Sequence, residues 1–399
     1  MTLADVAFPA DAGKRLRAAS MVQALAPRCE LHVVVLFADA DPSLRPLPPG
    51  VQASWHVVPP NLLPQARAAA EAVVRRLPWQ VAVQDWSGAR RSLSARDGAY
   101  DLVWFGALDH FARLRGTVRA ERVIVDVDDV ETEKLARALS LSSSPALPRL
   151  DRLQRRIELP LWGRLQREVV RGADAVLVCS ELDRQRLALQ AAPGDGAAAA
   201  RIVSVPNTYT DPGSVPPRNP EGSCTVVVVA NYGTDQNLDA ATFAVHEVLP
   251  ALRAAVPGAR LRLVGRRPDR LAALVGAEGL DVVGCVESVA EELSRAHAVL
   301  VPIRFGGGTR LKILEALAYR VPIVSTTAGA EGIAAVPGEH LLIGDSPDEI
   351  VAAVRRLLVE GGLEQRLTAA GRRLYESRYQ PSAAAATVAA TLTRVLAKR

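Results

Sequence analysis

Short apolar runs recur along the whole chain, and segments with helical periodicity separate them. Near-continuous runs, such as LHVVVLFA at residues 31–38, are typical of strands that are buried on both faces of a parallel sheet. Between them, apolar residues recur every three or four positions, which predicts amphipathic helices. The alternation predicts an α/β chain with doubly wound parallel sheets. The predicted strands are a short one within 1–8, and 31–38, 51–59, 100–106, 122–129, 173–180, 202–207, 225–230, 261–265, 281–286, 298–303, 321–326 and 340–344.

The segment 208–222, TYTDPGSVPPRNPEG, interrupts this alternation with Pro, Gly and polar residues. It has the composition of an interdomain linker. We therefore expect an N-terminal Rossmann-like domain over 1–212, a second over 213–379, and a terminal helix over 380–399 that crosses back to the first domain. A length of 399 residues also favours two cores over one. Two such domains predict a ligand cleft between the carboxyl edges of their sheets.

Composition narrows the class of protein further. The net charge of +5 is mild and aromatic residues make up 4%, which argues against a nucleic-acid binder. The four cysteines are scattered without metal or disulfide spacing, and neither a signal peptide nor a membrane-spanning run is evident. We expect a cytoplasmic protein. A basic amphipathic helix from residue 150 either lies weakly on an anionic membrane or packs against its own domain, and Pro160 and Gly163 are expected to interrupt it.

The segment 306–315 carries the strongest chemical signal. Three glycines follow an apolar run, and Arg310 and Lys312 occupy the first turn of a predicted helix. Cations oppose the helix dipole there, whereas a phosphate held by open backbone amides and both cations would remove the conflict. The alternative is a surface helix with solvated Arg and Lys. Gly13, Lys14 and Arg17 repeat the pattern near the N-terminus, so two loops are expected to converge on one polyanionic ligand, unless this helix end is only exposed to water.

Polar side chains follow two neighbouring strands of the first half. Asp109 and His110 come after one strand, and a carboxylate cluster comes after the next, at Asp126, Asp128, Asp129 and Glu131. The carboxylates can bind sugar hydroxyls, bind a divalent metal, or cap the following helix. Cations already serve the predicted phosphates, so a metal is the least favoured of the three. A structural and a catalytic role remain open for His110.

Several motifs together resemble the retaining glycosyltransferases of the GT-B fold, in the family 4-like group (glycosyl transferases group 1). The resemblance covers nearly the whole chain. The motifs are GGGTRLK at 306–312, LEALAYRVPIVST at 314–326, AGAEG at 328–332, LVGRRP at 263–268, VPN at 205–207 and PADAGKRLRA at 9–18. The resemblance implies transfer of a sugar from a nucleoside diphosphate sugar to an acceptor hydroxyl, with retention of configuration and without a metal or other cofactor. The acceptor is expected to be a small molecule, a lipid-linked group or a saccharide.

The resemblance also assigns residues to roles. It places the donor diphosphate on Arg310, Lys312 and the backbone of Gly306, Gly307, Gly308 and Thr309, and the ribose on Glu315. Further donor positions that it implies are Gly13, Arg266, Val286 and Glu331. It implies acceptor contacts at Lys14, Arg17 and Asp109, and catalytic roles for Arg310, Lys312, Asp128 and His110.

This chain departs from the family pattern at three positions. Gly307 stands where many relatives carry a glutamate, and Asp128 lies nearest to the position of a histidine. Arg320 stands where a glycine commonly ends the signature helix, and a left-handed conformation there would cost on the order of 1 kcal/mol. Two alternatives therefore stay open: a sugar-nucleotide epimerase of the same fold, and a non-catalytic auxiliary protein of the same fold that binds a partner.

Overall fold

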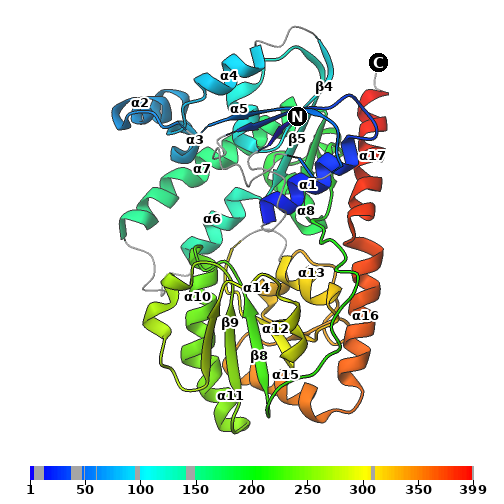
Figure 1. Cartoon of the computed structure of the whole chain (residues 1–399). Helices are drawn as coiled ribbons and strands as arrows, with labels where there is room; N and C mark the ends of the chain where they lie inside the picture. Colours follow the sequence, from blue (N-terminus) through cyan, green and yellow to red (C-terminus); the bar gives the residue numbers. More distant parts are fainter. Residues whose placement is uncertain are drawn as a thin grey trace. The chain divides into compact units, whose positions relative to one another are not determined.

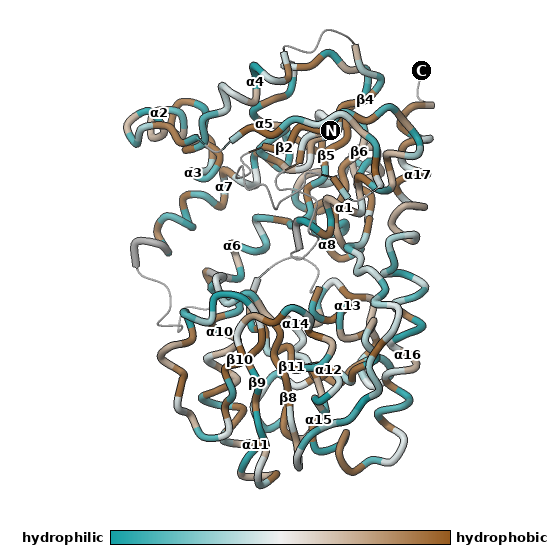
Figure 2. The backbone as a smooth tube through the Cα atoms, in the orientation of Figure 1, coloured by the Kyte–Doolittle hydropathy of each residue, from teal (hydrophilic) through white to brown (hydrophobic). Residues whose placement is uncertain are grey.

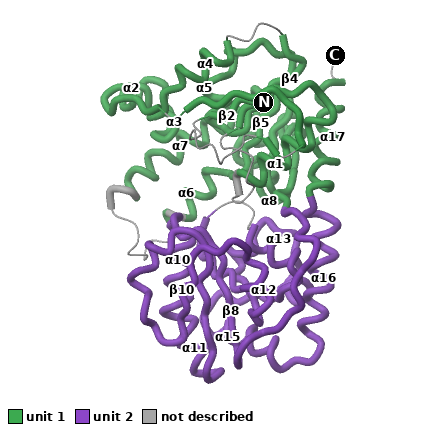
Figure 3. Tube along the Cα trace, viewed as in Figure 1, with its two compact units in different colours: residues 1–142, 147–208, 381–399 green, residues 143–146, 209–380 purple. Residues whose placement is uncertain are grey.

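A computed structural model describes residues 1–3, 13–36, 47–48, 50–59, 61–94, 99–140, 149–306 and 311–397. The described chain forms two compact units (Figure 3). Unit 1 contains the described residues up to Thr208 together with those from Pro381 onward, and unit 2 runs from Tyr209 to Gln380. Each unit has its own sheet and its own hydrophobic core.

Unit 1 is built on a parallel sheet of seven strands in the order β3-β2-β1-β4-β5-β6-β7 (Figure 1). The strands are β1 (Thr2–Leu3), β2 (His32–Leu36), β3 (Ser54–Val58), β4 (Tyr100–Phe105), β5 (Ala120–Asp128), β6 (Ala175–Val178) and β7 (Ile202–Ser204). Its helices are α1 (Gly13–Leu25), α2 (Gln65–Arg75), α3 (Trp79–Ala82), α4 (Ser87–Ser94), α5 (Leu108–Leu114), α6 (Glu131–Ser140), α7 (Arg149–Gly172), α8 (Glu181–Ala191), α9 (Gly196–Ala199) and α17 (Pro381–Leu396).

Helices cover both faces of this sheet because successive strand residues point to opposite sides. Val33 and Val35 of β2 pack with α1 and α17, whereas Val34 and Leu36 pack in the cluster that includes α4, α5, α7 and α8. The strands are therefore apolar on both faces, and Figure 2 shows hydrophobic residues along the strands at the centre of the unit. Full burial of each such side chain stabilises the fold by about 1.5–3 kcal/mol.

Unit 2 repeats the three-layer plan with a parallel sheet of six strands in the order β10-β9-β8-β11-β12-β13. The strands are β8 (Thr225–Val229), β9 (Arg260–Val264), β10 (Leu280–Gly284), β11 (Ala298–Val301), β12 (Ile323–Ser325) and β13 (Leu342–Ile343). The helices are α10 (Asp235–Phe243), the π-helix η1 (Ala244–Val248), α11 (Leu249–Ala255), the 3₁₀ helix η2 (Pro268–Leu274), α12 (Ala290–Arg295), α13 (Leu311–Ala318), α14 (Thr327–Ala330), α15 (Pro347–Val359) and α16 (Leu363–Arg378).

The expected interruption of the long helix is wrong. α7 runs unbroken from Arg149 to Gly172 with Pro160 inside it. A proline removes one backbone hydrogen bond, but the buried side chains of Trp162, Leu165 and Val169 hold the following turns in the core. Tertiary packing therefore outweighs the local cost. In unit 2, Arg320 has a φ of 57°, so the left-handed conformation suspected from its position is present.

Candidate functional site

The strongest sequence motif lies at the carboxyl edge of the unit 2 sheet. The chain leaves β11, reaches Gly306 at a φ of 117°, a value that favours glycine, and enters α13 at Leu311. Gly307, Gly308, Thr309 and Arg310 lie outside the described residues, so their assignment to the phosphates stays a prediction.

Lys312 is held at this edge by a neighbouring helix start. Its Nζ donates a hydrogen bond of 2.9 Å to Oδ1 of Asn237, in the first turn of α10. The Asn237 amide in turn donates to the carbonyl oxygen of Asn231 at 2.8 Å, which ties it to the loop after β8. The ammonium group therefore has a fixed place between the loops that follow β8 and β11.

Glu315 lies one turn further along α13 and is oriented by Tyr209. The Tyr209 hydroxyl donates to Oε1 of Glu315 at 2.8 Å. Burial raises the pKa of the carboxyl group, and the bond from Tyr209 and the charge of Lys312 oppose this shift. Tyr319 packs edge-to-face on Tyr209 with ring centroids 6.4 Å apart. One carboxylate oxygen is thus fixed by the protein, and the group can accept further hydrogen bonds from a ligand diol.

The other predicted donor residues follow neighbouring strands of the same sheet. Arg266 comes two residues after β9, Val286 two residues after β10, and Glu331 directly after α14, and all three are partly buried. Gly265 permits the turn after β9, since a Cβ there would lie 1.8 Å from the carbonyl oxygen of Ala230. The carboxyl ends of parallel strands meet at one edge, so the fold gathers these loops with Lys312.

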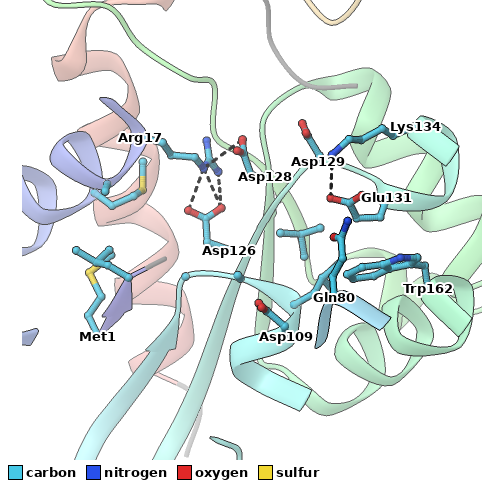
Figure 4. Close-up of a pocket in the computed structure, with 17 residues that line it drawn as sticks. Met1, Arg17, Gln80, Asp109, Asp126, Asp128, Asp129, Glu131, Lys134 and Trp162 are labelled. Carbon is cyan, nitrogen blue, oxygen red and sulfur yellow. Dashed lines mark hydrogen bonds and ion pairs between the residues drawn. The ribbon is translucent and has the colours of Figure 1, made fainter. Parts of the chain in front are cut away.

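Unit 1 contains a pocket of about 200 Å³ at the corresponding edge of its own sheet (Figure 4). Its lining comes from the start of the chain with β1, from the ends of β4 and β5, and from the helices α1, α3, α5, α6 and α7. The polar side chains in the lining are Arg17, Gln80, Asp109, Asp126, Asp128, Asp129, Glu131 and Lys134. Apolar groups complete the wall, with Trp162 the largest of them. The pocket is therefore rich in carboxylates.

Arg17 is already paired inside the protein, whereas the helix start predicted a cation that faces either a polyanionic ligand or water. Its guanidinium makes a bidentate contact with Asp126, with Nη2 2.6 Å from Oδ1 and Nε 2.9 Å from Oδ2. It also donates to the carbonyl oxygen of Val205 at 3.0 Å and to Oδ1 of Asn207 at 2.8 Å. Although burial acts in the opposite direction, the charge of Asp126 holds the pKa of Arg17 above its usual value. Its role toward an acceptor stays a prediction.

Asp128 stands in a strained position beside this pair. A β-bulge separates it from Asp126, and its φ of 57° is left-handed. Its Oδ1 accepts a hydrogen bond of 3.2 Å from Asn207 and lies 3.7 Å from Nε of Arg17. Residues held in sparsely populated backbone regions cluster at functional sites, so the strain is consistent with the predicted catalytic role, which remains untested.

The next residue, Asp129, belongs to the predicted carboxylate cluster, but the family resemblance assigns it no role. Burial raises its pKa to about 7, and the neighbouring Asp128 charge adds to the shift, whereas Lys134 opposes it. Lys134 itself lies 3.4 Å from Glu131. A carboxyl group that titrates near neutrality in a pocket can exchange a proton with a bound hydroxyl.

His110 does not belong to this pocket lining, whereas Asp109 does. The His110 side chain is buried, with Nδ1 2.9 Å from Oγ1 of Thr2 and its ring edge-to-face with Trp86. These contacts favour the structural role over the catalytic one. The backbone N–H of His110 donates to Oδ1 of Asp109. The side chain of Lys14 and the loop before Gly13 lie outside the described part of the chain.

Among the residues that the structure describes, one trio of potential metal ligands occurs, and two of its members line the pocket. The ligand atoms of Asp128, Asp129 and Cys179 lie within 4.8 Å of one another. Burial and the nearby carboxylates raise the pKa of Cys179 well above its ordinary value, and its Sγ donates to Asp183. A metal would have to displace the proton of this thiol, and independence from metals stays a prediction.

Two Rossmann-like units with these strand orders define the GT-B fold of glycosyltransferases. Residues 223–360, within unit 2, match the family model described as Glycosyl transferases group 1. The whole chain is similar in structure to sucrose-phosphate synthase from Thermosynechococcus elongatus, with a TM-score of 0.68, 16% identity, and coverage of 100% of this chain and 96% of the other. It is also similar to HepE of Anabaena, solved with UDP and glucose, with a TM-score of 0.59, 13% identity and 98% coverage of each chain.

In sequence, 212 residues are 30% identical to an exopolysaccharide phosphotransferase from Streptomyces coelicolor, which corresponds to 51% of this chain and 21% of that relative. The chain thus spans about a fifth of the length of this curated relative. The structural similarities lie below 25% identity and establish the fold.

Proposed function

We propose that this protein transfers a glycosyl group from a nucleoside diphosphate sugar to a hydroxyl group of an acceptor. The observation that carries the proposal is the arrangement on α13, inside the segment that matches the glycosyl transferases group 1 model. There, Lys312 is fixed by Asn237 and Glu315 by Tyr209, one helical turn apart at the sheet edge. Solved proteins of the same fold that hold UDP or UDP-glucose support a nucleotide-sugar donor.

In this proposal, catalysis rests on the departing diphosphate, whose negative charge grows as the glycosidic bond breaks. Lys312 and Arg310 would stabilise that charge, and a fixed ammonium does so with little reorganisation. Glu315 would hold the ribose hydroxyls. Retention of configuration and independence from metals are parts of the proposal that derive from the family resemblance. The nucleotide sugar is a co-substrate, and no further cofactor is invoked.

The pocket of unit 1 is the proposed acceptor site. Its carboxylates accept hydrogen bonds from hydroxyl groups, and Trp162 offers an apolar face, a combination that suits a saccharide. A saccharide acceptor is supported by two of the similar proteins, an exopolysaccharide phosphotransferase and a lipopolysaccharide outer core galactosyltransferase. Asp128 and Asp129 are the side chains we place nearest to the reactive hydroxyl.

A panel of UDP, GDP, ADP and TDP tests the donor site. A true ligand at a hundredfold excess over its Kd should stabilise the protein by about 2.7 kcal/mol, measured by thermal unfolding. With the best donor sugar, Lys312→Ala should lower kcat/KM by about 10²–10³-fold. Arg356→Ala, at an exposed arginine of α15, is the matched control and should retain wild-type rates.

Product mass spectrometry then separates the alternatives. A glycosylated acceptor supports the proposal. Free nucleotide with an altered sugar and no acceptor would indicate an epimerase, and no response to any nucleoside diphosphate would indicate the non-catalytic auxiliary protein. Wild-type rates in Lys312→Ala would remove the phosphate assignment.

A further inference from the structure

The helix α2 of unit 1 has its apolar face turned to solvent. Surface helices normally bury their apolar stripe and expose polar residues. In α2, however, Ala68 is the buried residue, whereas Val73 and Val74 have 76% and 80% of their surface exposed. Val74 is more exposed than any other large hydrophobic residue among those described.

The exposed apolar residues form one continuous stripe. Ala66, Ala69, Ala70, Val73 and Val74 follow the i, i+3, i+4, i+7, i+8 spacing of a single helix face, and all five are exposed. Leu62, shortly before the helix, is also 61% exposed. At 100° per residue, this stripe is centred opposite to Ala68. We call the stripe together with Leu62 the α2 apolar face.

Polar interactions hold the opposite side of α2 against unit 1. Glu71 accepts a hydrogen bond of 2.8 Å from the buried Arg113 of α5 and pairs with Arg75 at 3.0 Å. The carbonyl oxygen of Arg75 accepts from Arg164 of α7. These contacts fix the helix with its apolar side outward, so the exposure follows from the fold (Figure 1 shows α2 next to α3 at the margin of the unit).

Arginines border the α2 apolar face. Arg67 lies next to Val74 around the helix, Arg76 caps the helix end beside Ala69, and Arg164 lies near the last turn; all three are exposed. The neighbouring acids are engaged by the protein: Glu71 binds Arg113, and Asp85 accepts hydrogen bonds from Asn61 and from the backbone of Ser87. The border of the face is therefore positive.

We propose that the α2 apolar face binds the surface of an anionic lipid bilayer. An exposed apolar stripe with arginines on its borders is the pattern of a helix that lies in the plane of a membrane interface. A second copy of this chain would bring the same arginines against one another, so charge complementarity favours lipid phosphates. Among the residues that the structure describes, every helix is too short or too polar to cross a bilayer.

Vesicle flotation tests the proposal with the full chain. The probes are vesicles of phosphatidylcholine with one quarter phosphatidylglycerol and vesicles of phosphatidylcholine alone. We expect binding to the anionic vesicles, weakening with salt, and at least tenfold weaker binding to the neutral ones. Val73→Ser/Val74→Ser should reduce the partition coefficient about tenfold, and Arg67→Gln/Arg76→Gln should reduce it by about fivefold per arginine.

The control variant is Leu189→Ser/Val359→Ser, which removes two equally exposed apolar residues on α8 and α15 and should bind like wild type. Since all the substituted side chains are exposed, the variants should keep the wild-type thermal midpoint, which is checked first. Failure of the wild type to float with anionic vesicles would overturn the proposal. So would unchanged binding of the valine variant, or a wild-type dimer in light scattering that this variant abolishes.

Discussion

Replacement of Asp129 with asparagine should change the pH dependence of stability in a defined direction. Burial raises the pKa of Asp129 from 3.8 to about 7. The folded protein therefore keeps this proton up to about pH 7, whereas the unfolded chain releases it near pH 4. Since the folded state binds more protons over this interval, stability falls as pH rises from about 4 to about 7 and then levels off. Asparagine carries no charge at any pH, so Asp129→Asn removes this loss of stability.

The magnitude follows from the shift. About three pKa units correspond to roughly 4 kcal/mol at 1.36 kcal/mol per unit. Asp129 is partly exposed, so solvent screening reduces the expected effect to about 2 kcal/mol. Asp129→Asn should match the wild type at about pH 4 and below, and exceed its free energy of unfolding by about 2 kcal/mol at pH 8.

Urea denaturation followed by tryptophan fluorescence is the appropriate assay. All five tryptophans lie in unit 1, so the signal reports the unit that contains Asp129. Asp101→Asn, at an exposed aspartate of β4, provides the matched control across the same pH series. A stability difference between Asp129→Asn and wild type that stays constant from pH 5 to pH 8 would refute the reasoning.

Three further substitutions test other contacts. Tyr209→Phe removes one hydrogen bond to Glu315 and should raise the KM for the donor about fivefold, since such a bond contributes about 1 kcal/mol. Steady-state kinetics measure this change, and an unchanged thermal midpoint would separate the positioning role from a folding defect. Asp126→Asn leaves the buried Arg17 without its charge partner and should cost about 3–5 kcal/mol in urea denaturation, and a loss below 1 kcal/mol would contradict the pairing. Arg320→Gly removes the backbone strain of a left-handed residue and should raise the free energy of unfolding by up to about 1 kcal/mol. The gain should be visible as a higher thermal midpoint, whereas a lower midpoint would show that the Arg320 side chain compensates the strain.

The fold could be predicted from the sequence because buried parallel strands require continuous apolar runs. The runs at 225–230 and 298–303 became β8 and β11, adjacent at the centre of one sheet. The continuity of α7 across Pro160 could not be predicted from the sequence in the same way. It depends on residues of α7 that become buried only when other helices pack against them. Local propensity is a weak guide where tertiary burial is extensive.

The site was predictable where the signal was local. Lys312 and Glu315 share one helix turn, so their proximity followed from spacing alone. The partner of Arg17 is Asp126, 109 positions away, and the partner of Glu315 is Tyr209, 106 positions away. No periodicity connects residues at such separations. His110 shows the converse problem, because a histidine beside a loop can turn either toward the pocket or toward the core.

The return of the chain to unit 1 has a consequence for biosynthesis. α17 supplies Ala384, Val388, Leu392 and Val395 to the core that also contains α1 and the central strands of unit 1. The residues of unit 2 from Tyr209 to Gln380 lie between β7 and this helix in the sequence. During synthesis, residues 209–380 are therefore added to the nascent chain before α17 is made and can cover α1. The unit that the ribosome begins first is the second to be completed, and until then its α1 face remains open to chaperones.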